Sequence, residues 1–74
     1  MSENSGKLVQ ILGSVVDVAF EPGNLPETYE ALTISREGKK DMVLEVQKQL
    51  PDNWVRCIAM ESTDGLLRGL DVNI

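Results

Sequence analysis

The chain has no histidine and only one cysteine among its 74 residues. Histidine is the commonest general base near neutral pH and the commonest metal ligand, so its absence argues against both kinds of site. With Cys57 alone, no intrachain disulfide can form, and Cys–His catalysis and the usual zinc sites are excluded. This cysteine usage is typical of a reducing compartment, most simply the cytosol.

Excess positive charge and long apolar runs are also missing. Seven basic and 12 acidic side chains give a net charge of −5, which repels nucleic-acid phosphates and acidic membrane surfaces. The longest apolar-rich stretch, residues 7–20, is interrupted by polar residues and falls short of the roughly 18 that span a bilayer. We therefore expect no nucleic-acid partner and no direct membrane insertion. Residues 1–6 lack the apolar core of a signal peptide.

What remains is the composition of one small globular domain, with 42% hydrophobic and 26% charged residues. A chain of this size buries only roughly 60% of the surface that its unfolded form exposes, which leaves little room for an enclosed active site. Residues 1–6 are small and polar, and we expect them to form a flexible N-terminal lead-in. The folded domain is predicted to cover residues 7–74.

Alternation of apolar and polar side chains with a period of two predicts short antiparallel strands. In residues 7–20 the inward positions change from odd numbers, as in Val9, to even numbers, as in Val16, which predicts a bulge or bend at Gly13 and Ser14. Further strands separated by polar turns are predicted over residues 31–35, 42–49, 54–60 and 70–74. About six short strands in so small a chain predict an all-β fold, a small six-stranded antiparallel closed barrel, because closure removes exposed edges.

The strand at residues 54–60 has apolar groups on both faces, so the face that carries Trp54 is a candidate interface. Cys57 lies on the other face and is interpreted as a small buried hydrophobe, with a reactive thiol as the alternative. Trp54 fits either core packing or an interface. Arg68 is either a surface charge with its stem packed down or an interface residue paired with a carboxylate.

No motif for chemistry is found. Neither Gly6-Lys7 nor Gly38-Lys39 has the glycine spacing of a phosphate-binding loop, so both are interpreted as turns. The carboxylates near the C-terminus, those of Glu61, Asp64 and Asp71, fit no cation-binding loop, and a solvated turn accounts for Asp64. We therefore assign no catalytic, cofactor-binding or metal-binding residue.

Two segments carry a resemblance to a known family. Residues 7–20 read KLVQILGSVVDVAF and residues 42–70 read MVLEVQKQLPDNWVRCIAMESTDGLLRGL. Both closely resemble the N-terminal beta-barrel (crown) domain of the F-type ATP synthase beta subunit, which opens with G-K-V-x-Q-V-x-G-x-V-V-D-V-x-F and continues with V-R-x-I-A-M-x-S-T-D-G-L-x-R-G. Residues 59–65 look like the beta rather than the alpha subunit. The resemblance runs from Gly6 to the C-terminus, and Ser14 replaces a usual proline.

The resemblance implies a six-stranded barrel that packs beside alpha-subunit barrels in an alternating ring of six and holds that ring together. It implies a parent enzyme that binds Mg-ATP and Mg-ADP in a central domain absent from this chain, so no activity or cofactor is expected here. It also implies a peripheral position in the F1 sector, on the cytoplasmic face of the inner or plasma membrane, most simply in a bacterium.

Two alternatives stay open. The first is an independent small-barrel binding module for single-stranded nucleic acid or a protein ligand, which the charge of −5 and the three aromatic residues disfavour. The second is self-association of the isolated domain, because a ring-facing surface would lack its neighbour.

Overall fold

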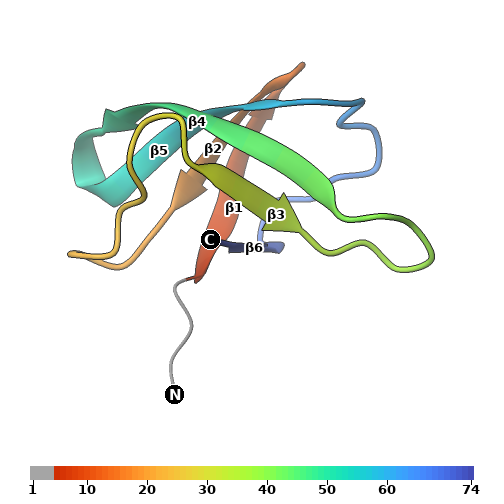
Figure 1. The fold of residues 1–74 in the computed structure, drawn as a ribbon, viewed down its shortest axis with the longest axis horizontal. Helices are drawn as coiled ribbons and strands as arrows, with labels where there is room; N and C mark the ends of the chain where they lie inside the picture. Colours follow the sequence, from red (N-terminus) through yellow and green to blue (C-terminus); the bar gives the residue numbers. More distant parts are fainter. Residues whose placement is uncertain (1–4) are drawn as a thin grey trace.

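Six strands and one short 3-10 turn make up the computed structural model, which describes residues 5–74. The elements are β1 (Ser5–Leu12), β2 (Val15–Ala19), β3 (Ala31–Ile34), β4 (Met42–Leu50), η1 (Pro51–Asn53), β5 (Trp54–Ala59) and β6 (Asp71–Asn73). Every paired strand is antiparallel to its neighbour, and the order β1-β2-β5-β4-β3-β6 closes on itself (Figure 1). The predicted six-stranded closed barrel is confirmed.

The barrel interior is filled by the inward side chains of all six strands. In β3 and β4 the alternation predicted from sequence is confirmed, since Leu32 and Leu44 are fully buried while Val43 is exposed. In β5 the inward residues are Val55, Cys57 and Ala59, as predicted. The buried apolar side chains are Leu8, Val16, Val18, Phe20, Leu32, Ile34, Met42, Leu44, Val46, Val55, Cys57, Ala59, Leu66 and Val72.

The turn between β1 and β2 corrects the prediction for residues 7–20. Gly13 and Ser14 form no bulge: they are the two central residues of a tight hairpin, in which Leu12 pairs with Val15. Gly13 has a φ of 61°, the left-handed region that a two-residue hairpin turn requires and that glycine adopts without steric cost. The chain therefore reverses direction at the point where a bend within one strand was expected.

The change of parity occurs instead at a bulge in β1. Leu8 pairs with Val18, but the next pair joins Gln10 to Asp17, so Val9 is the extra residue. Leu8 is consequently a buried core residue and Val9 is only half-buried, which reverses the prediction that Val9 is the inward residue here. The bulge matters for function because it places Gln10 beside Asp17.

Strand β1 begins at Ser5, earlier than the predicted domain start. Gly6 is buried and pairs with Val72 of β6, so this part of the expected lead-in belongs to the barrel. A Cβ on Gly6 would lie 2.6 Å from the carbonyl oxygen of Ala19 and 2.8 Å from Cγ1 of Val18, which explains why only glycine fits there. Residues 1–4 of the expected lead-in lie outside the described residues.

The barrel closes through its shortest strand. Figure 1 shows β6 beside β1, near the C-terminus of the chain. Three residues of β6 pair with β1, whereas a single pair, Thr33 with Asn73, joins β6 to β3. The segment before β6 extends the contact with β1, because the amide of Gly69 donates to the carbonyl of Leu8 at 2.7 Å.

Candidate functional site

The most unusual side chain of the barrel is a buried acid on its outer surface. Val16 and Val18 point into the core, so Asp17, which lies between them on β2, points outward. Asp17 is nevertheless only 1% exposed, and among the described residues it is the only buried charged side chain. The sheet register explains this, because Asp17 is flanked by Gln10 of β1 and Arg56 of β5.

Arg56 and Gln10 satisfy both oxygens of the Asp17 carboxylate. Nε of Arg56 donates to Oδ1 at 3.0 Å and Nη2 donates to Oδ2 at 3.0 Å, which is a bidentate ion pair. Nε2 of Gln10 donates to Oδ2 at 3.2 Å. The hydrogen bonds that Arg56 donates to Asp17, and then the negative charge of Asp17, raise the pKa of Arg56 above its ordinary value. The guanidinium therefore stays charged, and its two hydrogen bonds to Asp17 fix its orientation.

A shallow cleft of about 330 Å³ lies next to this ion pair. Trp54 forms one of its walls and is half-buried. Of the two roles left open for Trp54, core packing is not observed, because its side chain lies on the outer surface. The cleft is lined by Gln10, Asp17, Leu50, Pro51, Asp52, Trp54 and Arg56.

Beyond the ion pair, the same surface is largely apolar, although Glu45 of β4 lies opposite Ile58 and Lys48 lies opposite Arg56. Ile58 is 37% exposed and pairs with Val15 of β2. Met60 is 56% exposed, and its amide donates to the carbonyl of Val43, which is 40% exposed. We call the outward side chains of these three strands the β2–β5–β4 face, made up of Val15, Asp17, Ala19, Val43, Glu45, Lys48, Leu50, Trp54, Arg56, Ile58 and Met60.

Cys57 points away from this face into the core. Its side chain is fully buried, which confirms the interpretation as a small hydrophobe. Burial, with a smaller contribution from the charge of Asp17, raises the pKa of the thiol to about 12. A thiol that stays protonated at neutral pH is not a nucleophile, so the reactive-thiol alternative is wrong.

Arg68 lies at a second surface cavity, on the other side of β1. This groove has a volume of about 380 Å³ and is lined by Gln10, Ile11, Leu66, Leu67 and Arg68. Arg68 and Leu67 are both exposed, and Arg68 has no carboxylate partner among residues 5–74. Of the two interpretations of Arg68, the surface charge fits this structure.

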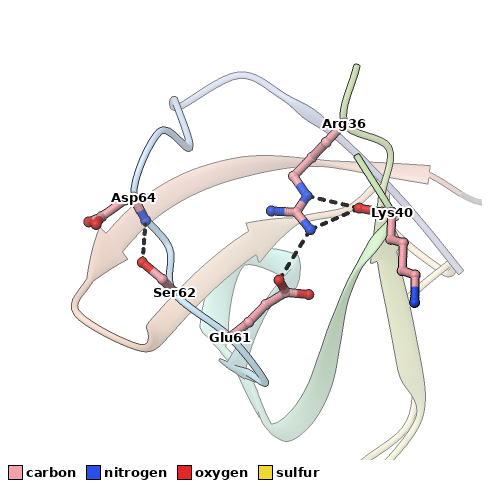
Figure 2. A network of polar contacts seen from close by, with 5 residues as sticks. All are labelled: Arg36, Lys40, Glu61, Ser62 and Asp64. Carbon is pink, nitrogen blue, oxygen red and sulfur yellow. Dashed lines mark hydrogen bonds and ion pairs between the residues drawn. The ribbon is translucent and has the colours of Figure 1, made fainter. Parts of the chain in front are cut away.

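The three C-terminal carboxylates do not converge. Asp71 pairs with Lys7, and Glu61 accepts a hydrogen bond from Nη2 of Arg36 at 3.2 Å. Figure 2 shows that the Arg36 guanidinium also holds the backbone carbonyl of Lys40, so it ties the β3–β4 loop to the loop after β5. Within residues 5–74 there is no group of three His, Cys, Asp or Glu side chains that could hold a metal ion.

The Asp17–Arg56–Gln10 cluster was not predicted from the sequence. A signal was present, because Asp17 interrupts a run of valines and Arg56 interrupts an otherwise apolar strand face. Neither position reveals its partner, since the pairing depends on β2 lying beside β5, far away in sequence. The strand face that was predicted as a candidate interface does lie on the outer surface, where Ile58 and Met60 are exposed and Trp54 is half-buried.

Comparison with known families adds a direct finding. A family model described as "ATP synthase alpha/beta family, beta-barrel domain" matches residues 8–73. The match therefore includes all six strands apart from the first residues of β1, and it contains both the ion pair and the β2–β5–β4 face. No helix within the described residues is long and apolar enough to cross a membrane.

Proposed function

Because this chain belongs to the ATP synthase alpha/beta family as its beta-barrel domain, we propose that it is the N-terminal domain of an F-type ATP synthase beta subunit. Its role is to hold alternating alpha and beta subunits together in a ring. The closed barrel carries this proposal: every strand is paired on both sides, so the domain has no free edge and keeps its shape when attached parts move.

Two further parts of the proposal rest on the sequence. Residues 59–65, which read AMESTDG, resemble the beta subunit, and this favours beta over alpha. The catalytic work, with Mg-ATP and Mg-ADP, belongs to other parts of the parent protein. We place the parent in the F1 sector, peripheral to the cytoplasmic face of the inner or plasma membrane of a bacterium.

Association with an alpha subunit tests the role in the ring. The chain is mixed with purified alpha subunit from the same ATP synthase, and complex formation is followed by sedimentation velocity over a range of salt concentrations. We expect a complex that contains both proteins. Failure to associate at every ionic strength would overturn the proposal.

The cellular location is tested on source cells with an antibody against the barrel. We expect a band several times larger than 8.2 kDa that sediments with membranes and is released by mild low-salt treatment. A soluble band of the size of this chain would contradict the assignment to a beta subunit.

A further inference from the structure

We infer that the β2–β5–β4 face is one of the two surfaces through which this barrel contacts neighbouring barrel domains of its own family. The inference rests on the proposed function, because it takes the neighbour to be another subunit of the ring. A closed ring of subunits needs two different contact surfaces on each member. The structure assigns one of them to named residues.

The first argument is the composition of the face. Along β5 the outward side chains are Trp54, Arg56, Ile58 and Met60, and Val15 and Val43 flank them on the adjacent strands. Aromatic residues, methionine and arginine are the types enriched at the centres of protein interfaces. Ile58 and Met60 are also among the large apolar side chains that the barrel leaves exposed.

The second argument is that a partner can cover the centre of the face without burying an unpaired charge. Covering an unpaired charge is costly, but Asp17 is 1% exposed before any partner binds, and Arg56 neutralises it in a bidentate pair. A neighbour that covers this region therefore meets no unsatisfied carboxylate. This also accounts for an acid that is buried on the outer side of a barrel.

The third argument is the charge of the face, which favours another folded subunit over a nucleic acid as the molecule that binds there. The charged side chains of the face, Asp17, Glu45, Lys48 and Arg56, sum to zero, whereas the whole chain carries −5. A nucleic acid finds no positive field on this face. The acidic charge lies elsewhere on the molecule, so this surface admits another folded subunit without net repulsion.

The size of the barrel is compatible with a specific contact. A specific interface buries about 800 Å² on each partner, and the accessible surface of the chain is 4758 Å². The contact thus requires about one sixth of the surface, and the face is built from three of the six strands. A broad sheet surface of this kind suits another sheet, as in the barrel of a family member.

The experiment compares two lysine substitutions in the native 74-residue chain. Ile58→Lys places a charge at the middle of the face, and Leu67→Lys is the matched control on the far side of β1, at a side chain that is 68% exposed. Affinity for purified alpha subunit is measured by sedimentation or calorimetry. We expect Ile58→Lys to weaken one of the two alpha contacts by tenfold or more, and Leu67→Lys, which lies outside this face, to change the affinity of that contact by less than twofold.

The outcomes separate this inference from the function on which it rests. If the native chain binds and Ile58→Lys binds the same number of alpha subunits with unchanged affinity, the face is not a contact surface, although the ring function stands. If the native chain does not bind alpha subunit, both proposals fail. Concentration-dependent dimerisation of the chain, abolished by Ile58→Lys in the absence of alpha binding, would make a second copy the occupant and overturn the inference. Should Ile58→Lys fail to fold by circular dichroism, Met60→Lys provides the same test.

Discussion

At the scale of single residues, the three ion pairs found within residues 5–74 differ in what they contribute. Lys7–Asp71 is exposed on both sides, and Glu61 of the Arg36 pair is 48% exposed. Such pairs typically add less than about 1 kcal/mol, because water screens the charges. The carboxylate of Asp17 is buried and depends on Arg56 and Gln10 for its hydrogen bonds, so its pair is the one that the folded state requires.

Removal of Arg56 is the first test at this scale. Arg56→Ala leaves the Asp17 carboxylate nearly buried with only Gln10 as a partner, and we expect the free energy of unfolding to fall by about 2–3 kcal/mol. Urea denaturation measures the loss. Lys48→Ala, which removes the exposed cation opposite Arg56 on β4, should change stability by no more than about 0.5 kcal/mol. Equal effects of the two substitutions would show that the pair is ordinary surface charge.

Cys57 predicts a pH dependence of stability. The folded chain holds the thiol protonated up to about pH 12, whereas in the unfolded chain it titrates near 9.0. Because folding raises the pKa of the thiol, the stability that the protonated thiol contributes is fully present below pH 9 and is lost as the pH rises toward 12. At pH 10.5 the loss amounts to about 2 kcal/mol.

The measurement compares urea unfolding at pH 7.5 and pH 10.5 for the native chain and for Cys57→Ala. Other groups titrate in this range in both proteins, so the difference between their declines isolates the thiol. We expect the native chain to lose more stability than the variant. Parallel declines would mean that the thiol does not couple to folding.

At the scale of elements, the start of β1 is fixed by a glycine. A methyl group at Gly6 would collide with the backbone of Ala19 and with Val18, which are parts of a rigid wall. We expect Gly6→Ala to lower the midpoint of thermal unfolding, with a cost of about 1–3 kcal/mol from overpacking. Ser5→Ala, the preceding position in the same strand, is the control and should be nearly neutral. An unchanged midpoint for Gly6→Ala would contradict the close packing of β1 on β2.

Most of the elements could be predicted because their alternation is regular. In β3, β4 and β5 the buried side chains fall on one parity, and the loops of these strands are rich in turn-forming residues. The strands within residues 7–20 were harder to predict. A hairpin turn and a bulge each change whether odd-numbered or even-numbered residues point inward, so the sequence pattern does not distinguish one from the other. Gly13-Ser14 was recognised as the irregular point but not as a reversal, and the bulge at Val9 has no composition signal of its own.

The candidate site was predictable only to the extent that it follows one strand. The alternation along residues 54–60 was enough to predict that Trp54 and Met60 share the outer face of the strand. The ion pair needs three strands in a given order, and β2 lies beside β5 only because the chain between them forms β3 and β4 elsewhere in the barrel. Pairings of this range depend on the whole topology and are not encoded locally.

At the scale of the whole molecule, charge separates the ring function from the alternative of a nucleic-acid module. With a net charge of −5 and a neutral central face, the chain should not bind a labelled single-stranded oligonucleotide at physiological salt. Fluorescence anisotropy tests this, with a basic single-strand-binding protein as the positive control. Tight binding would contradict the charge argument and reopen the alternative.

The closure of the barrel by β6 has a mechanical consequence. Ser5 pairs with Asn73, and the two strands run antiparallel from that pair, so tension between these residues pulls on the hydrogen bonds one pair at a time. Such a load unzips a ladder, whereas tension along neighbouring strands in opposite directions strains many bonds at once. Stretched between Ser5 and Asn73, the domain would peel open at β6 under low force. The same barrel would resist far more strongly a pull that draws the paired strands β4 and β5 along their lengths in opposite directions.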